Sequence, residues 1–211
     1  MIVVLLGAPG AGKGTQAKAI CENFDMSHVS TGDILRNEIK KGTELGKKVA
    51  GFVESGKLVP DDVIIEIIKK RIGEDRSEKG FLMDGFPRNL KQAKMFREML
   101  DELGIKLDTV INIVVDKDEI IERLSNRRIC SGCKSIFSAN EDGKILTECP
   151  KCGAQLVIRK DDEPEVIRHR LEVYESETRP LIDFYEAGGI LVNIDGSGDK
   201  DKITERILQV L

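Results

Sequence analysis

A glycine-rich stretch near the start of the chain has the residue types that bind phosphate. Residues 7–15 have the sequence GAPGAGKGT and follow the apolar run Ile2–Leu6. Glycines let successive backbone N–H groups point inward at phosphate oxygens, a following helix adds its positive end, and Lys13 supplies a full charge. We therefore predict a phosphate site formed by Gly10, Ala11, Gly12, Lys13, Gly14 and Thr15.

The hydroxyl of this stretch comes one position later than the common phosphate-loop pattern G-x-x-x-x-G-K-[ST] requires. The residue after Lys13 is Gly14, and the hydroxyl is on Thr15. Because glycine has no side chain to hold Mg²⁺, waters and carboxylates from elsewhere in the chain must hold the ion. Asp84, which follows the apolar run Phe81–Met83, is our candidate, and a simple turn-forming role is the alternative.

Four of the five cysteines form two C-x-x-C pairs, Cys130 with Cys133 and Cys149 with Cys152. Two pairs at this spacing are typical of a tetrahedral metal site, and four thiolates would leave no position open for substrate. We predict a structural zinc ion, with iron in the same cage or a reduced, metal-free segment as alternatives. The fifth cysteine, Cys21, is expected to be a small buried residue.

The composition excludes few classes of protein but narrows the choice of partners. The chain has 211 residues, of which 40% are hydrophobic and 33% charged, and its net charge is −4. A general nucleic-acid binder would carry a basic surplus. No stretch approaches the ~20 apolar residues that span a bilayer, and no basic leader precedes the first apolar run. We expect a cytoplasmic protein without nucleic-acid or membrane partners.

Short apolar runs alternate with amphipathic stretches along the chain. The runs predict strands at Ile2–Leu6, His28–Val29, Phe81–Met83, Val110–Val115 and Ile190–Ile194. The 3.6-residue patterns between them predict helices at Lys13–Phe24, Pro60–Ile72, Asn89–Leu103, Asp118–Arg128, Pro164–Glu186 and Lys200–Leu211. This alternation predicts an α/β fold, a five-stranded parallel sheet flanked by helices, with ligands at the carboxyl ends of the strands.

Two segments interrupt the alternation. Residues 30–59 contain short helical pieces broken by five glycines, with no strand pattern. Residues 129–159 carry the paired cysteines, few helix formers in periodic order and a turn signal at Glu141–Gly143. We interpret both as insertions into the core, and insertions at a ligand-binding edge are candidates for mobile lids.

Several motifs, in one order, resemble the adenylate kinase family in its long form with a cysteine-knuckle lid. They are GAPGAGKGTQA at 7–17, STGDILR at 30–36, DGFPRNLKQA at 84–93 and RRICSGC with CPKCG in the cysteine segment. The shifted loop hydroxyl is normal in that family. The resemblance covers the whole chain and implies a P-loop NTPase-like fold with two inserted subdomains. Its core would be residues 1–29, 60–121 and 163–211, its monophosphate-binding insertion 30–59 and its lid 122–162.

The resemblance also implies an activity, the reversible transfer of the terminal phosphoryl group from Mg-ATP to AMP, which gives two ADP. Phosphoryl transfer depends on positively charged groups that stabilise the transferring phosphoryl group more than on covalent catalysis. By similarity to the family, the catalytic residues are Lys13, Asp84, Arg88, Arg123, Arg127, Arg159 and Arg170. ATP would be bound by residues 10–15, Arg123 and Arg127. AMP would be bound by Thr31, Arg36, Lys57, Val59, Gly85, Arg88, Gln92, Arg159 and Arg170. Monomer is the family expectation.

Three further expectations concern charged side chains around this site. Arg123 and Arg127 are spaced i,i+4, so one helix face would present both to a single anion. No general base is required because a monophosphate oxygen is already anionic, so we interpret His28 as a packed or surface residue and His169 as part of a charged helix. The resemblance implies that the acidic run at 161–162, besides starting a helix, pairs with cleft arginines when the lid closes.

The identity of the acceptor base depends on three positions. In the family Thr31 and Gln92 meet adenine, where related pyrimidine kinases tend to have Ala and Asn, so AMP is predicted. Asn89 stands where adenylate kinases usually have Thr, and the run PRN is more familiar from the pyrimidine enzymes. A pyrimidine or broad-specificity nucleoside monophosphate kinase is therefore the alternative.

Two alternative classes of protein are disfavoured because the chain lacks the sequence motifs that are typical of them. A regulatory P-loop switch would carry Ser or Thr directly after Lys13 and an N-K-x-D motif, and the chain has neither. A zinc-ribbon nucleic-acid module would carry basic and aromatic residues around its cysteines. Here the lysines of the cysteine segment are offset by acidic residues, and Phe137 is its one aromatic residue.

Overall fold

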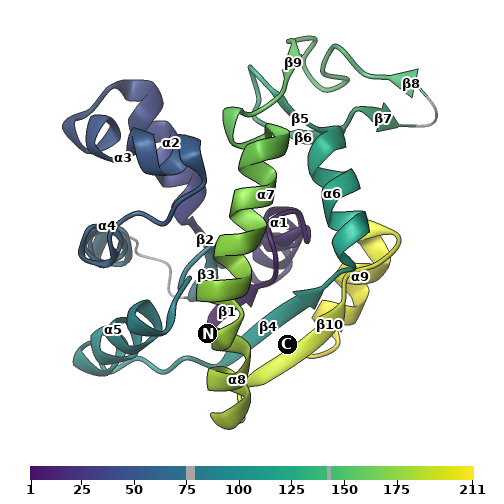
Figure 1. The fold of residues 1–211 in the computed structure, drawn as a ribbon. Helices are drawn as coiled ribbons and strands as arrows, with labels where there is room; N and C mark the ends of the chain where they lie inside the picture. Colours follow the sequence, from purple (N-terminus) through teal and green to yellow (C-terminus); the bar gives the residue numbers. More distant parts are fainter. Residues whose placement is uncertain (75–78, 142–143) are drawn as a thin grey trace.

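The computed structural model describes residues 1–74, 79–141 and 144–211, with a five-stranded sheet at its centre (Figure 1). The strand order is β10-β4-β1-β3-β2, and every neighbouring pair is parallel. The predicted fold class is therefore confirmed, and each strand lies within two residues of its predicted bounds. The strands are β1 Ile2–Leu6, β2 Ser27–Ser30, β3 Phe81–Asp84, β4 Thr109–Val114 and β10 Leu191–Asp195.

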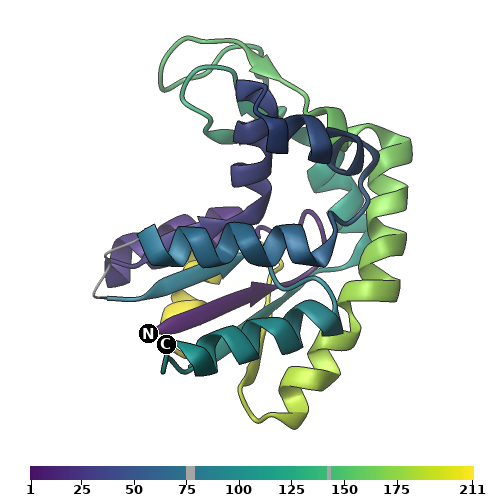
Figure 2. The same ribbon diagram turned by 90° about the vertical axis from the view of Figure 1, so that its left-hand side faces the viewer.

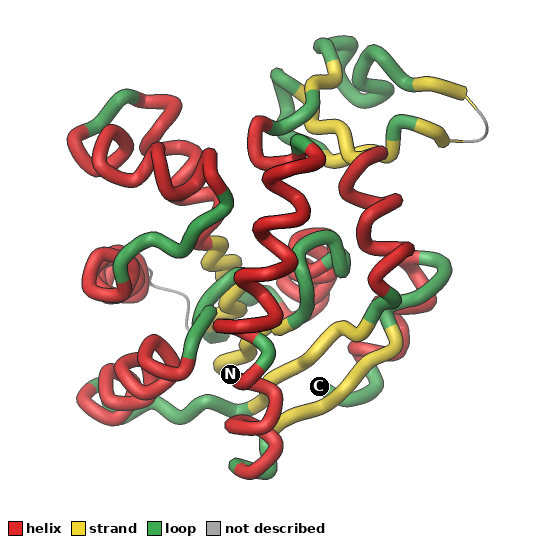
Figure 3. Tube along the Cα trace, viewed as in Figure 1, coloured by secondary structure: helices red, strands yellow, loops and turns green. Residues whose placement is uncertain are grey.

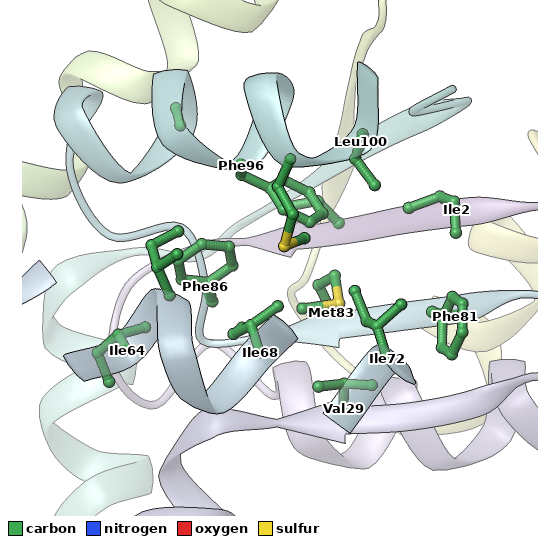
Figure 4. Packing of buried hydrophobic residues seen from close by; sticks show 14 of the residues in the cluster. Ile2, Val29, Ile64, Ile68, Ile72, Phe81, Met83, Phe86, Phe96 and Leu100 are labelled. Carbon is green, nitrogen blue, oxygen red and sulfur yellow. The ribbon is translucent and has the colours of Figure 1, made fainter. Parts of the chain in front are cut away.

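Helices cover both faces of the sheet because β1 is apolar at every position. Val3 and Leu5 pack against α1 (Lys13–Phe24) and α9 (Lys200–Leu208). The alternate residues of β1 belong to a second cluster, shared with α4 (Asp61–Glu74), α5 (Leu90–Glu102) and α8 (Pro180–Ala187). Figure 4 shows the centre of this cluster, where the rings of Phe86 and Phe96 meet edge to face at 5.2 Å.

The first insertion consists of two helices, α2 (Thr31–Lys41) and α3 (Glu44–Ser55). Gly42 and Gly56 end them with positive φ values of 67° and 76°. Gly46, in contrast, lies inside α3, and a Cβ there would be 2.2 Å from the Glu38 carbonyl oxygen. The glycines of this segment therefore have two roles, and only two of the five end a helix.

The second insertion consists of short strands joined by loops, whereas the first is helical (Figure 3). An antiparallel sheet joins β6 (Ile136–Ser138), β5 (Arg127–Cys130) and β9 (Leu156–Val157). A smaller hairpin joins β7 (Asn140–Glu141) to β8 (Lys144–Ile145), and positions 142–143 of the predicted turn lie outside the described residues. The segment is flanked by α6 (Lys117–Asn126) and by a short 3₁₀ helix, η1 (Lys160–Asp162), which leads into α7 (Pro164–Val173).

The predicted bounds of three helices were wrong. The last helix, predicted at Lys200–Leu211, ends at Leu208. The helix predicted at Asp118–Arg128 ends at Asn126, because Arg127 is extended and pairs with Ser138 across the β5–β6 ladder. Arg123 and Arg127 therefore do not share a helix face. The helix predicted at Pro164–Glu186 is divided by a π-helical turn.

That turn, η2 (Tyr174–Thr178), separates α7 from α8 in the long helical column of Figure 2. Pro180 lacks an N–H and cannot continue the normal ladder. The backbone instead makes a wider bond, in which the Arg179 N–H donates to the Tyr174 carbonyl at 2.8 Å. In the part of the chain that the structure describes, no helix is long and apolar enough to cross a membrane.

Candidate nucleotide and metal sites

The glycine-rich loop connects the carboxyl end of β1 to the first turn of α1. Gly12 takes the left-handed conformation with φ 94°, and α1 begins at Lys13. The Lys13 ammonium donates to the carbonyl oxygens of Gly7 at 2.7 Å and Ala8 at 2.9 Å. Burial lowers the pKa of Lys13 to about 8; Asp84 opposes this shift, while nearby arginines add to it. The loop therefore holds a partly desolvated cation at the place where a phosphate would bring compensating charge.

This pKa shift predicts a specific dependence of stability on pH. Unfolding returns the pKa of Lys13 from about 8 to its ordinary 10.5, so the folded state is penalised below pH 8 and relieved as the pH rises through that window. Compared with Lys13→Met, the wild-type protein should gain about 3 kcal/mol of stability between pH 7 and about 10.5. Urea unfolding of both proteins across this range measures the difference. Two parallel stability curves would contradict the assignment.

Asp84 ends β3 and lies beside the first turn of α1. A Cβ at Gly14 would be 3.4 Å from Asp84 Oδ2, so the carboxylate occupies the space next to the residue that lacks a side chain. Burial alone would raise the pKa of Asp84, but the hydrogen bond from His28 and the charge of Lys13 hold it below the ordinary value. An ionised carboxylate at this place fits a Mg²⁺ ion that keeps several of its waters.

His28, interpreted as a packed or surface residue, is partly buried in β2 and contacts a charged residue of the site. His28 Nε2 lies 3.3 Å from Asp84 Oδ2, because parallel pairing of β2 with β3 brings the two strand ends together. Sequence spacing could not show this contact, since 56 residues separate the pair.

A cavity lies between α2, the end of α3 and the carboxyl end of β3. Its predicted residues are Thr31, Arg36, Lys57, Val59, Gly85, Arg88, Gln92 and Arg170. The cavity is also lined by residues that were not predicted for it. The apolar ones were missed because apolar periodicity alone does not separate pocket from core, and the additional lining residues are Gly32, Leu35, Val53, Gly56, Leu58, Ile64 and Asp161. Arg159 does not line this cavity. Burial, followed by repulsion from Arg36 and Arg127, lowers its pKa to about 10.

The cationic groups around the cavity differ in whether a carboxylate neutralises them. Asp162 accepts hydrogen bonds from both Arg127 and Arg170, and Asp161 lies 3.3 Å from Arg170. Among the described residues, no carboxylate lies within ion-pair distance of Arg88. Burial, with repulsion from Arg170 and Arg36, lowers the pKa of Arg88 to about 10. Arg88 therefore lacks the carboxylate partner that Arg127 and Arg170 have.

Arg123, on α6, lies next to the glycine-rich loop and not at the cavity. Its guanidinium donates to Glu119 at 2.5 Å and to the Gly196 carbonyl at 2.8 Å. A Cβ at Gly12 would be 3.9 Å from Arg123 Nη1. The structure thus places Arg123, from α6, against the loop, whereas Arg127, at the start of β5, pairs with Asp162.

The four paired cysteines come together in the second insertion, at and after the end of β5 and in the loop between β8 and β9. Their Sγ atoms all lie within 4.8 Å of one another, with 3.4 Å between Cys130 and Cys152 and 3.6 Å between Cys133 and Cys149. A tetrahedral zinc ion with 2.3 Å bonds separates its sulfur ligands by about 3.8 Å. The cluster therefore fits a metal ion. Cys21 is outside it and is half-buried, not fully buried as expected.

Comparison with known proteins agrees with this geometry. The family model for adenylate kinase matches residues 5–190. Adenylate kinases of Archaeoglobus fulgidus, Finegoldia magna and Caldanaerobacter subterraneus subsp. tengcongensis are 45%, 46% and 47% identical to the chain. The alignments cover 100% of this chain and 98%, 99% and 96% of these relatives. The chain belongs to the adenylate kinase family. It is a phosphotransferase with the nucleotide-binding features of that family.

Family membership supports the adenylate kinase prediction over the pyrimidine kinase alternative, and the structure explains the unusual Asn89. Asn89 is the N-cap of α5, and its Oδ1 accepts the backbone N–H of Gln92 at 2.8 Å. Its Nδ2 donates to Asp61 Oδ1 at 2.9 Å. The side chain of Asn89 therefore caps α5 and binds Asp61. Asp61, which also contacts Gln92, was missed because acidic residues at a helix start are common.

Proposed function

We propose that this adenylate kinase transfers the terminal phosphoryl group of Mg-ATP to AMP, which binds in the cavity between α2 and β3. The observation that carries the proposal is the combination of side chains in one cavity. Arg36 and Arg88 suit a monophosphate, and Thr31 and Gln92 supply polar atoms for a base. The ammonium of Lys13, at the start of the adjacent helix, interacts electrostatically with Asp84, which raises its pKa, and with Arg88, which lowers it. These positions agree with the residue roles that the family resemblance implies.

The proposed mechanism relies on positioning and on electrostatic stabilisation. The backbone of residues 10–15 and Lys13 would hold the donor phosphates, with Arg123 and Arg127 on the lid side. Arg88, Arg159 and Arg170 would stabilise the charge of the transferring group. The acceptor oxygen of AMP is already anionic, so no side chain needs to remove a proton.

Two metal ions belong to the proposal. Mg²⁺ bound with ATP would neutralise charge on the phosphate oxygens, with Asp84 as its carboxylate partner through water. The cysteine cluster would hold zinc as a structural ion, since four thiolates complete a tetrahedral shell.

The two insertions are proposed to be the monophosphate-binding subdomain, 30–59, and the lid, 122–162. Their closure would exclude water, which otherwise competes with AMP as acceptor. Contacts between the end of the first insertion and residues at and after the end of the lid support this coupling. Lys160 Nζ lies 2.9 Å from Glu54 Oε1, and a Cβ at Gly56 would be 2.6 Å from Arg170 Cγ. A monomer in the cytoplasm is part of the proposal and rests on the family resemblance alone.

The proposal predicts a strong preference for AMP among acceptors. Phosphoryl transfer from Mg-ATP should be measured with AMP, CMP, UMP and GMP at matched concentrations, together with a reaction that has no acceptor. We expect kcat/KM for AMP to exceed the other values by at least about 100-fold, because buried polar groups of the base site stay unpaired with a wrong base. Comparable turnover of CMP or UMP would contradict the assignment of Thr31 and Gln92.

A further inference from the structure

The side-chain amide of Gln92 is held at both of its polar atoms. Oε1 accepts the backbone N–H of Arg88 at 2.8 Å, and Nε2 donates to Asp61 Oδ1 at 2.8 Å. Gln92 is almost fully buried, with 2% of its surface exposed, and it lines the proposed AMP cavity. An amide has two donors and two acceptor lone pairs, so one N–H and one lone pair remain for a ligand.

These two partners determine which way the amide faces. A backbone N–H is only a donor and an ionised carboxylate is only an acceptor. Turning the amide by 180° would place the NH₂ group of Gln92 against the N–H of Arg88 and its oxygen against the carboxylate of Asp61. Buried groups left unpaired in this way are costly. One orientation is therefore strongly favoured before any nucleotide binds.

Hydrogen bonds and a nearby lysine keep the Asp61 carboxylate ionised and in place. Burial would raise the pKa of Asp61, but hydrogen bonds from Asn89, Gln92 and Lys91 outweigh that effect and lower it. Asn89 Nδ2 donates to the same oxygen that accepts from Gln92, and Lys91 Nζ lies 3.3 Å from the other oxygen. At neutral pH the carboxylate thus remains an acceptor only.

We propose that Asp61 is a positioning residue that determines specificity: by fixing the orientation of the Gln92 amide, it makes the acceptor site select 6-aminopurines over 6-oxopurines. The inference rests on the proposed function, in which Gln92 meets the base. It adds Asp61, which does not line the cavity, to the residues that determine base specificity. It also gives the Asn89–Asp61 hydrogen bond a role in that specificity.

The reason lies in the hydrogen-bonding edge of the base. Adenine offers an acceptor at N1 and a donor at its 6-amino group, whereas hypoxanthine and guanine offer a donor at N1 and an acceptor at O6. An amide that is free to turn pairs with either edge, because its donor and acceptor simply exchange places. An amide that is held in one orientation pairs with one edge and leaves unpaired polar groups against the other.

The test compares AMP and IMP as acceptors for the wild-type protein and for Asp61→Asn. An asparagine at this position has both a donor and an acceptor, so it removes the part of the orientation preference that Asp61 imposes with little change in shape, while the Arg88 N–H continues to favour the original orientation. We expect the ratio of kcat/KM for AMP over IMP to fall about tenfold, the effect of one well-placed hydrogen bond. Part of the fall should be a rise in kcat/KM for IMP, which loss of structure alone would not produce.

Asp62→Asn is the matched control, because it removes the same charge from the same turn of α4 at an exposed side chain. It should leave the ratio unchanged. Asp61→Ser, whose hydroxyl also donates and accepts, provides a second variant if Asp61→Asn is poorly folded, and thermal melting of each variant reports folding.

Three results separate the outcomes. An unchanged ratio in both Asp61 variants, or an equal loss with AMP and IMP, overturns the proposal for Asp61. An unchanged ratio in Gln92→Ala overturns the base contact itself, and with it the assignment on which the proposal rests. A wild-type protein that does not prefer AMP overturns the proposed acceptor without reference to Asp61.

Discussion

Replacing Arg88 with alanine is expected to lower kcat by about 10³-fold, the scale of effect known for arginines that stabilise transferring phosphoryl groups. Arg88 lines the acceptor cavity, and its Nε donates to the Gly85 carbonyl at 2.8 Å, which holds the guanidinium at the carboxyl end of β3. Arg127 and Arg170 have Asp162 as a partner, whereas Arg88 has no ion-pair partner among the described residues. A phosphate would therefore be the main source of compensating charge for it.

The fold itself should tolerate this change. Burial and the neighbouring Arg170 and Arg36 already disfavour the charged form of Arg88, as the lowering of its pKa shows. We expect the melting temperature to stay within a few degrees of the wild-type value. Arg168→Ala is the control, since that arginine is exposed and pairs with Glu165 on the outer surface of α7. Steady-state kinetics and thermal melting measure both quantities, and a rate within tenfold of wild type would contradict the role.

Loss of metal from the cysteine cluster is expected to unfold the second insertion while the core sheet remains folded. Between residues 130 and 157, the described residues that are both buried and apolar are Cys130, Ala139 and Cys149. Ile145 is 76% exposed, so the hairpin adds little apolar burial. Metal binding is worth ~10–16 kcal/mol in small zinc modules, which is comparable to the ~5–15 kcal/mol of net stability of a typical domain. A metal ion bound at the cluster would therefore supply most of the local folding free energy.

Chelation of the wild-type protein and the variant Cys149→Ser test this expectation. Hydrogen exchange should show loss of protection at residues 127–157 with protection of β1 and β4 retained, and the melting temperature should fall. Cys21→Ser is the control for loss of a thiol outside the cluster, and it should retain its metal. Unchanged exchange and melting after metal analysis has verified removal would contradict the structural role.

Local features of the sequence were sufficient for much of this architecture. The apolar runs predicted every strand of the central sheet, because strands buried on both faces need apolar residues at successive positions. The glycine-rich loop and the two C-x-x-C pairs were predicted from spacing alone. Within the loop and within each C-x-x-C pair the functional atoms lie a few residues apart, so backbone geometry restricts where they can be placed.

Predictions failed where distant segments compete for the same residue. Arg127 continues a helical pattern, yet the ladder with Ser138 draws it into β5. Pro180 sits in a long helical pattern, and the π turn before it places the Thr178 hydroxyl 2.7 Å from the Arg88 carbonyl. Helix propensities differ by only tenths of a kcal/mol per residue, so such tertiary contacts override them.

The sequence by itself therefore determined the class of fold, the phosphate loop, the thiolate cluster and membership of a kinase family, since each depends on neighbouring residues. Only the tertiary structure decided which arginines are neutralised, that His28 contacts Asp84, and that Asp61 orients Gln92. The contacts of Arg127 with Asp162, of His28 with Asp84 and of Gln92 with Asp61 join residues 31 to 56 positions apart. The physical reason is that charge compensation and hydrogen-bond orientation depend on distances of about 3 Å, which only the packing of separate elements sets.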